Sequence, residues 1–392
     1  MSETQKTIYL DNGATSFPKP PAVEAAMSHF MLKIGGSPGR SGHRLSQEAA
    51  RVVFECREAL AGLIGAPDSK RVVFTLNATQ ALNTALYGTL RRGDRVVTTS
   101  MEHNSVMRPL RDLERRGVIE LHVLPCERTG SLDPRLLEET VRTHRPRLVA
   151  AVHASNVTGS VIPLRDVGGI CRAAGALLLV DAAQSAGALP IDVEADRVDL
   201  LAFTGHKSLY GPMGTGGLVI GERVDATRLE PLKRGGTGSR SEHEEQPEFL
   251  PDLCESGTPN AVGLAGLGAS VRWVLTERVE KIRAHELALT GQLLAGLAAI
   301  PGVTVYGTRD PARQTATVSF NIAGLEPSEV GLRLDDEYEI ACRVGLHCAP
   351  AAHRTLGTFP GGSVRFGLSA FNTAEQVAAA LDAVAALARE AR

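Results

Sequence analysis

The hydrophobic positions between about residues 45 and 220 form short apolar runs that alternate with helix-length segments. Several runs are uninterrupted by polar residues, which is typical of strands covered on both faces. The runs are RVVFT (71–75), RVVTTS (95–100), IELHVL (119–124), RLVAAVHAS (147–155), ALLLVDA (176–182), LLAFT (200–204) and GGLVIG (216–221). Helical patterns such as 78–90 and 134–143 lie between them. This alternation predicts an α/β domain with a mostly parallel seven-stranded sheet.

Residues 222–257 break this alternation, because they are rich in Gly, Ser, Glu and Pro and predict an extended loop. Thr258 followed by Pro259 then predicts the start of a helix. One long amphipathic helix is expected from the helical spacing of seven apolar residues: Val271, Val274, Leu275, Val279, Ile282, Leu289 and Leu293. The segments after it predict a smaller α+β domain. Its last helix opens at Thr373, with Gln376 at the spacing of a capping box.

The length of 392 residues favours two domains over a single core. We expect a large α/β domain over residues 18–260 and a small α+β domain formed by 1–17 and 261–392. The formal net charge of −2 argues against a nucleic-acid partner. No apolar run is long enough to span a membrane, and the first residues lack the apolar segment of a secretory signal. These features predict a cytoplasmic protein.

The six cysteines contain no C-x-x-C pair, so neither a disulfide framework nor a zinc site is indicated, and no metal is expected. Cys56 lies on the apolar face of a helical pattern, and Cys171 and Cys342 also fit small buried positions. Cys348, in RVGLHCA, is different because a histidine precedes it. Its local sequence leaves three roles open: a core thiol, a metal ligand or a nucleophile.

Two charged residues follow predicted strands, and ligands of parallel sheets bind at those ends. Asp181 ends the run ALLLVD, and Lys207 follows LLAFTGH. They could form a structural ion pair. A phosphate loop is disfavoured because the Walker spacing is absent. A third interpretation joins them: the lysine forms a Schiff base with pyridoxal phosphate, and the aspartate keeps the pyridine nitrogen protonated.

This cofactor interpretation requires a phosphate cradle and a flat partner for the ring. Asn77, Ala78 and Thr79 open a helix just after a predicted strand, where backbone N–H groups and a hydroxyl suit an anion. His103 follows the run RVVTTS and could stack on the ring or act as an acid or base. Together these strand-end residues favour a cofactor site.

Seven stretches then identify a family: IYLDNGATSFPKP, EHNS, ASNVTG, VDAAQSAG, TGHKSLYGPMGTGGL, ESGTPN and RVGLHCA. They resemble the class V aminotransferase-fold enzymes, and among these the cysteine desulfurases with an R-x-G-x-H-C-A active cysteine. The resemblance covers residues 8–372. It implies fold type I of the pyridoxal phosphate enzymes and conversion of L-cysteine to L-alanine, with the sulfur transferred to Cys348 as a persulfide.

The resemblance also implies roles for the cofactor-side residues. Lys207 would hold the cofactor and take the substrate Cα proton, Asp181 would pair with the ring nitrogen, and Gln184 would bond the ring hydroxyl. His103 would stack on the ring. The other expected cofactor contacts, mainly to the phosphate, are Ala78, Thr79, Thr204, His206, Asn156 and, from a second subunit, Thr258.

On the substrate side, the resemblance implies that Arg365 binds the carboxylate, for which a planar guanidinium is suited. Val364 and Phe366 flank it, so Arg365 is expected on the opposite face of that strand. The other expected substrate contacts are Asn156, Ala14, His43 and Arg343. His347 or Arg343 would lower the pKa of the Cys348 thiol.

The sequence departs from the family pattern at Gly13, usually alanine, and at Leu346, where the first of two adjacent histidines is expected. The resemblance also implies a homodimer and a sulfur-acceptor protein. Other interpretations remain open: a lyase for selenocysteine, cysteine or cystine, an aminotransferase, or a non-catalytic scaffold. L-Selenocysteine is the alternative substrate that is hardest to separate from L-cysteine.

Overall fold

A seven-stranded sheet forms the centre of the computed structural model, which describes residues 7–39 and 42–392. Its strands, in spatial order, are β2 (Val72–Thr75), β8 (Gly216–Ile220), β7 (Leu200–Thr204), β6 (Leu177–Asp181), β5 (Leu148–Val152), β3 (Asp94–Thr99) and β4 (Ile119–Leu124). Only β8 runs antiparallel to its neighbours. The predicted mostly parallel seven-stranded sheet is confirmed.

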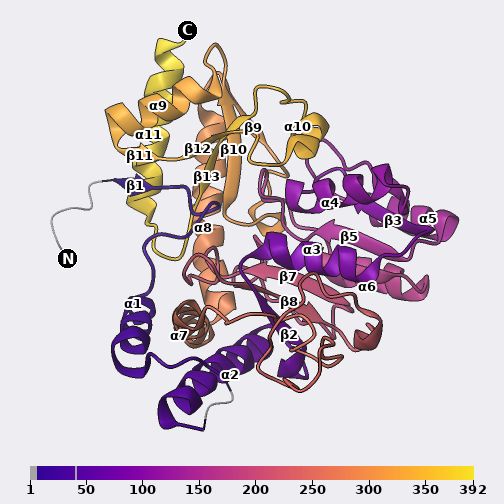
Figure 1. Cartoon of the computed structure of the whole chain (residues 1–392). Helices are drawn as coiled ribbons and strands as arrows, with labels where there is room; N and C mark the ends of the chain where they lie inside the picture. The colour runs from indigo at the N-terminus through magenta and orange to yellow at the C-terminus, as the bar shows by residue number, and fades with distance from the viewer. Residues whose placement is uncertain (1–6, 40–41) are drawn as a thin grey trace.

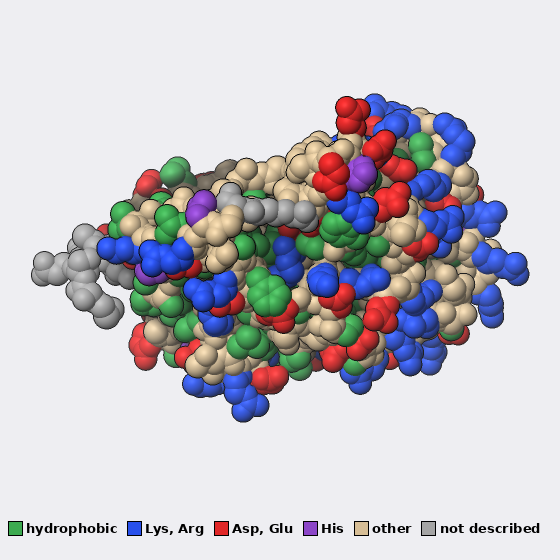
Figure 2. Space-filling view, turned by 60° about the horizontal axis from the view of Figure 1, so that its bottom comes forward, with side chains coloured by type: hydrophobic (Ala, Val, Ile, Leu, Met, Phe, Trp, Pro, Cys, Tyr) green, Lys and Arg blue, Asp and Glu red, His purple; other side chains and the backbone are tan. Residues whose placement is uncertain are grey.

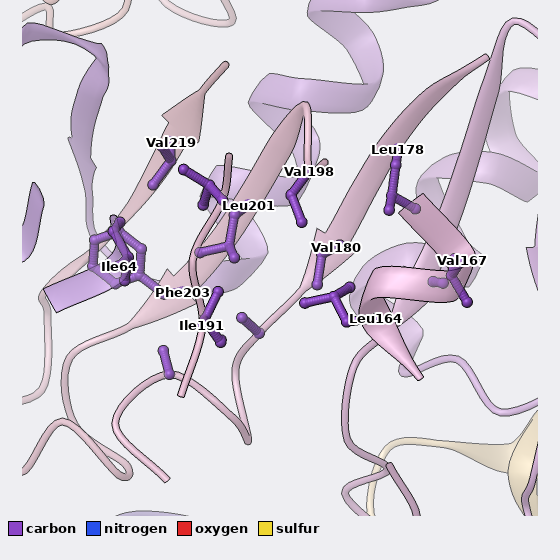
Figure 3. Packing of buried hydrophobic residues seen from close by; sticks show 14 of the residues in the cluster. Ile64, Leu164, Val167, Leu178, Val180, Ile191, Val198, Leu201, Phe203 and Val219 are labelled. Atoms are coloured by element: carbon purple, nitrogen blue, oxygen red, sulfur yellow. The ribbon is translucent and has the colours of Figure 1, made fainter. Parts of the chain in front are cut away.

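Both faces of this sheet are covered by helices, which explains the uninterrupted apolar runs. Leu178 and Leu201 face one side, while Leu177 and Leu200 face the other, as the alternation of side chains along a strand requires. Figure 3 shows the first of these clusters around Phe203. Its helices are α2 (Arg44–Ile64), α5 (Pro134–His144), α6 (Leu164–Ala173) and α7 (Ala261–Glu277), and the opposite face carries α3 (Ala78–Thr89) and α4 (Asn104–Arg115).

A smaller antiparallel sheet has its own core at the other end of the molecule (Figure 1). Its strands, in order, are β12 (Arg343–Gly345), β13 (Ser363–Gly367), β10 (Thr317–Ile322) and β9 (Val303–Tyr306). It packs with α8 (Val279–Ala299), α9 (Pro327–Tyr338) and α11 (Ala374–Glu390). The capping box predicted for α11 is confirmed, with Thr373 and Gln376 bonding to each other's backbone.

The N-terminal strand β1 (Ile8–Tyr9) belongs to this smaller end, because it pairs in parallel with β11 (Ile340–Ala341). The chain then crosses to α1 (Pro21–His29) and the π-helical turn η1 (Phe30–Ile34) beside the large sheet (Figure 1). The remaining short elements are η2 (Ser69–Arg71), η3 (Ala226–Arg228), η4 (Pro311–Arg313) and α10 (Pro350–Leu356).

Two helix predictions were wrong. The helix expected from Thr258 begins at Ala261, because the Asn260 side chain accepts the Gly263 N–H and serves as the N-cap. The single long helix is interrupted at Arg278, whose φ of 69° separates α7 from α8. The apolar spacing continues through the break because α7 packs on the large core and α8 on the small one, while Leu275 is exposed.

This packing bears on the division into domains, which remains a prediction. Leu264, Leu267 and Val271 of α7 join the core of the large sheet, whereas Leu289 and Leu293 of α8 join the small core.

On the face shown in Figure 2, acidic and basic side chains are interspersed with exposed hydrophobic ones. Among the described helices, none combines the length and apolar character needed to cross a membrane.

Candidate active site

Asp181 and Lys207 meet at the carboxyl edge of the large sheet because their strands are neighbours. Asp181 is the last residue of β6, which runs parallel to β7 with Asp181 opposite Ala202. Lys207 comes just after β7, in the turn that follows Thr204. The carboxylate is 3% exposed and the lysine is half-buried. The structure thus brings together the two residues that the strand-end pattern selected.

Burial shifts the pKa of both groups toward their neutral forms. It lowers the pKa of the Lys207 amine to about 8, with the nearby Asp181 carboxylate opposing the shift. It also raises the pKa of Asp181, against the effect of the Ala183 N–H, 3.0 Å from Oδ1, and of Lys207. A lysine with a substantial neutral fraction can act as a nucleophile or a base near neutral pH.

A cavity that is open to solvent lies against this pair. Nine of the residues predicted for the site line it: Ala78, Thr79, His103, Asn156, Asp181, Gln184, Thr204, His206 and Lys207. Asn77, Ser105, Val152 and Ala183 complete the lining. Segments far apart in the sequence therefore converge on one concave site.

The N-terminus of α3 forms one wall of the cavity. The Asn77 side chain accepts the Gln80 N–H at 2.9 Å and caps the helix, and the N–H groups of Ala78 and Thr79 precede that capped position. Another lining residue, His206, has its Nδ1 buried without a hydrogen-bond partner. Free donors at a helix N-terminus and an unpartnered imidazole nitrogen suit a phosphate group.

Ser105 is a cavity residue that the sequence analysis missed. Its hydroxyl lies 2.7 Å from Oγ1 of Thr79 and 2.9 Å from Nδ1 of His103. It therefore links the wall formed by α3 to the imidazole at the start of α4. Its position in EHNS, two residues after His103, was the only available signal.

His103 is uncharged near neutral pH, and hydrogen bonds of the adjacent Glu102 hold its turn in place. Burial, together with nearby cations that include Lys207, lowers its pKa to about 4. The adjacent Glu102 is fully buried, and its Oε1 accepts from Oγ1 of Thr99 at 2.6 Å and from the Val152 N–H at 3.0 Å. These bonds tie the turn that carries His103 to two strands of the sheet.

Arg365 enters the site from β13 of the smaller sheet and is 2% exposed. Its Nη1 donates to the Asn156 carbonyl at 2.9 Å, and its Nη2 donates to Oδ1 of Asp11 at 2.9 Å. Nε is buried without a partner. Asp11 also lies 3.7 Å from Nη1 of Arg343, so one carboxylate neutralises part of a two-arginine cluster. A buried guanidinium with a free N–H suits a substrate carboxylate.

The departure from the family pattern at Gly13 has a structural counterpart. A Cβ at this position would lie 3.1 Å from Cζ of Arg365, closer than side chains normally pack. The Gly13 carbonyl accepts from Nε2 of Gln184 at 2.9 Å, so one N–H of the Gln184 amide is bonded to the backbone. Its predicted bond to the cofactor hydroxyl would use the remaining N–H and stays a prediction.

Cys348 lies on an exposed turn between β12 and α10. His347 and Cys348 have φ angles of 49° and 58°, a left-handed conformation that non-glycine residues seldom adopt. Two bonds from segments that follow strands of the large sheet hold this turn. Nδ2 of Asn156 donates to the His347 carbonyl at 2.6 Å, and the Asn104 N–H donates to the Cys348 carbonyl at 2.8 Å. The thiol is near enough to Lys207 to influence the pKa of its amine.

His347 does not offer the positive charge that was expected beside the thiol. It is 5% exposed, with Nε2 3.2 Å from the Ser363 hydroxyl. Burial and the neighbouring Arg365 hold its pKa far below the ordinary value, so the ring is neutral at physiological pH. Of the two residues proposed to activate the thiol, Arg343 is the one that carries a charge.

Six predicted site residues do not line the cofactor cavity: Arg365, Arg343 and Cys348, described above, and Thr258, His43 and Ala14. Thr258 is exposed and borders a different pocket with Thr75 and Gln80. His43 is exposed at the N-cap of α2, where its Nδ1 accepts the Ser46 N–H at 3.2 Å. Ala14 is half-buried near Asp11, to whose carbonyl its N–H donates at 2.9 Å. Their roles stay predictions.

The residues of the cavity fit pyridoxal phosphate. The unpartnered His206 nitrogen and the α3 N-terminus match its phosphate, and Lys207 matches its aldehyde. The carboxylate of Asp181 is buried with no cationic side chain within ion-pair distance among the described residues, which matches a protonated ring nitrogen.

Comparisons with known proteins agree with this geometry. The aminotransferase class-V family matches residues 8–380. The "Probable cysteine desulfurase" of Methanothermobacter thermautotrophicus is 37% identical over 94% of this chain and 92% of its own length. That of Pyrococcus abyssi is 33% identical over 99% and 96%.

Solved structures show the same likeness. The apo cysteine desulfurase from Thermococcus onnurineus NA1 superposes with a TM-score of 0.92 at 34% identity, covering 98% of this chain and 95% of the other. The S-sulfonic acid form of the cysteine desulfurase CsdA from Escherichia coli gives a TM-score of 0.86 at 29% identity, with coverage of 98% and 95%.

Proposed function

The chain belongs to the aminotransferase class-V family, and we propose that it is a pyridoxal phosphate-dependent cysteine desulfurase. It would convert L-cysteine to L-alanine and transfer the sulfur to Cys348. One observation carries the assignment to this activity. The buried guanidinium of Arg365 and the exposed thiol of Cys348 come from the smaller sheet and lie near enough to Lys207, the partner of Asp181, to affect the pKa of its amine. An aminotransferase or a scaffold has no need of the thiol.

The chain's own groups divide the work of the reaction. Arg365 would hold the substrate carboxylate through its free Nε–H. Lys207, whose pKa is lowered to about 8, would take the Cα proton. Asp181 would face the ring nitrogen, and the neutral His103 would lie against the ring. Bound pyridoxal phosphate supplies an electron sink for the pair released at Cα.

The sulfur step would belong to Cys348. Its thiolate attacks the substrate sulfur, and the bond between that sulfur and Cβ breaks. The bonding electron pair stays with the carbon, which is protonated and leaves as alanine, while a persulfide remains on Cys348. Two equivalents of a thiol reductant then release sulfide, regenerate Cys348 and form one disulfide. Arg343 is the charged group proposed to favour the thiolate.

A homodimer is the expected assembly. Thr258 lies outside this chain's own cofactor cavity, so its proposed phosphate contact would be made to a second copy. Met31, Leu32 and Phe54 are more than half exposed and are available for contact with a second copy. The cytoplasmic location and the sulfur-acceptor protein remain predictions.

The test of function is product analysis. Purified protein loaded with pyridoxal phosphate is incubated with L-cysteine and dithiothreitol, and alanine and sulfide are quantified together. We expect equal amounts of the two. Pyruvate and ammonia in place of alanine would indicate a lyase, and a requirement for a keto acid would indicate an aminotransferase. Either result would overturn the proposal. A parallel incubation with L-selenocysteine compares the two substrates.

A further inference from the structure

The carbonyl oxygen of His206 is surrounded by hydrogen-bond donors from a short N-terminal segment, residues 15–19. The Ser16 N–H lies at 2.9 Å, Oγ1 of Thr15 at 3.0 Å, Nζ of Lys19 at 3.0 Å and Oγ of Ser16 at 3.3 Å. A carbonyl oxygen has two lone pairs, and a charged donor forms the stronger type of bond. Four donors around one peptide oxygen are more than hydrogen-bond satisfaction requires.

That carbonyl belongs to the peptide unit that joins His206 to Lys207. Fixing its oxygen fixes the plane of the peptide from which the Lys207 side chain departs. On the other side of the lysine, the Lys207 carbonyl accepts the Tyr210 N–H at 2.8 Å. The Tyr210 hydroxyl in turn accepts the Ala370 N–H at 2.9 Å and donates to Oε1 of Glu286 at 3.3 Å. The backbone of Lys207 is therefore held on both sides.

Lys19 stands out among these donors because it is half-buried and has no carboxylate within 4 Å among the described residues. Its Nζ also donates to Oγ of Ser16 at 2.8 Å. Placing an ammonium group where water is partly excluded is unfavourable unless its bonds compensate. A lysine with only a surface role would extend into solvent, as Lys33 does.

We propose that Lys19 is a positioning residue for Lys207: its ammonium group fixes the His206 carbonyl and thereby directs the Lys207 side chain into the cavity. The inference rests on the proposed function and extends it to a residue outside the cavity. The residues just before this segment reach two other site residues, since Asp11 bonds Arg365 and the Gly13 carbonyl bonds Gln184. Residues 11–19 thus contact Arg365, Gln184 and the peptide that precedes Lys207, and Lys19 supplies the last of these contacts with a charged donor.

The test compares Lys19→Met with Lys19→Arg in the protein loaded with pyridoxal phosphate, and uses Lys33→Met as a matched surface control. The donors around the His206 carbonyl act as a clamp on the backbone of Lys207. Loss of the Lys19 donor from this clamp is expected to lower kcat about 10-fold or more, since small misplacements of a catalytic group are costly. KM for L-cysteine should change little. The visible absorption of the bound cofactor, titrated with pH, should shift its midpoint upward, because a positive charge bonded to the peptide before Lys207 is lost.

Lys19→Arg should restore the midpoint, since it keeps a charged donor, and Lys33→Met should match the wild type. An unchanged midpoint and kcat in Lys19→Met would overturn the proposal, as would a kcat loss that Lys19→Arg fails to reverse. If Lys19→Met does not fold, Thr15→Val removes one donor without removing the charge. It should then lower kcat several-fold with no shift of the midpoint, and an unchanged kcat would count against the clamp.

The two proposals fail in distinguishable ways. If the wild type binds pyridoxal phosphate but makes no alanine from cysteine, the desulfurase assignment falls. The absorption titration would still report whether Lys19 acts on Lys207, because it requires the bound cofactor and no turnover.

Discussion

Lys207 follows a central strand of the large sheet and is half-buried, whereas Cys348 follows the edge strand of the smaller sheet and is exposed. The lysine is fixed by hydrogen bonds on both sides of its backbone. The cysteine and its neighbour His347 adopt left-handed φ angles, which cost non-glycine residues about 1–2 kcal/mol each. The site therefore has two halves. The cofactor half, around Lys207, is rigid, whereas the backbone of the thiol half, around Cys348, depends on contacts from other segments of the chain.

The two reactive groups therefore belong to separately held parts of the fold, and a bound substrate would lie between them. The residues that line the cofactor cavity all lie on strands of the large sheet or in the segments that follow them. The thiol half is held in place by Asn156 and the Asn104 N–H, which follow strands β5 and β3 of the large sheet. Perturbations of the first half should therefore affect cofactor binding, and those of the second should affect only sulfur transfer.

The largest effect is expected from Lys207→Ala, which removes both the attachment point and the proposed base. Alanine formation should fall by about 10³-fold or more, and the visible absorption of the bound cofactor should disappear. The measurements are alanine yield and absorption after addition of pyridoxal phosphate. Lys33→Ala, at an exposed position, is the control. Retained absorption would show that another residue holds the cofactor.

Cys348→Ala tests the other half alone. We expect sulfide and alanine formation from L-cysteine to fall by about 100-fold or more, with the cofactor absorption unchanged. Cys342→Ala should retain activity, because that thiol packs against the core of the small sheet. Unchanged sulfide release in Cys348→Ala would remove the thiol from the mechanism and with it the distinction between the halves.

Arg365→Lys keeps the positive charge of the buried strand position but loses the planar fork. Charged hydrogen bonds contribute about 1.5–3 kcal/mol, so KM for L-cysteine should rise by roughly 10- to 100-fold. The cofactor absorption should not change, since Arg365 lies on the smaller sheet. Steady-state kinetics check the first expectation and a spectrum the second. A fall in kcat with KM unaltered would contradict a substrate-binding role.

The pKa of Lys207, lowered to about 8 by burial, predicts how uptake of the cofactor depends on pH. The neutral amine is the nucleophile, so the rate at which the apoprotein takes up pyridoxal phosphate should rise about 10-fold between pH 7 and pH 9. It should then level off. Stopped-flow absorption measures this rate. A rate still rising steeply above pH 9 would indicate an ordinary lysine.

The smallest effect is expected from Gly13→Ala. Gly13 lies between the two halves of the site, since it contacts both Gln184 and Arg365. The added Cβ would lie 3.1 Å from Cζ of Arg365 and push the guanidinium toward the cavity. Overpacking of this kind costs about 1 kcal/mol, so KM should rise about 5-fold. The absorption midpoint should be unaffected. A larger effect on kcat than on KM would mean that the strain reaches Lys207.

The sequence predicted the cofactor half well because its residues follow strands that are uninterrupted apolar runs. All seven runs became strands of the large sheet, and Asp181 and Lys207 follow two neighbouring ones. The break at Arg278 was not predictable from spacing, since apolar residues continue at helical intervals on both sides while packing on different cores. The cap at Asn260 was missed because Thr258 is an equally good local signal.

The contacts that could not be predicted join segments distant in the sequence. The bond from Lys19 to the His206 carbonyl and the bond from Asn156 to the His347 carbonyl each cross between such segments. The left-handed turn at His347 and Cys348 has no glycine at either of these two positions, so the sequence did not indicate it. Local patterns select residue types at element ends, but they carry no information on which backbone groups will meet across the fold.

The pairing of β1 with β11 sets an order of events during synthesis. Ile8 lies opposite Ile340, so the first strand has no partner until almost the whole chain has left the ribosome. The large sheet can form earlier, yet the N-terminal segment that holds Asp11 and Lys19 in place is anchored by that late pairing. In a nascent chain, Lys207 would therefore be present before residues 15–19 are held in place against the His206 carbonyl. Productive loading with the cofactor is expected only after β11 has been synthesised and has paired with β1.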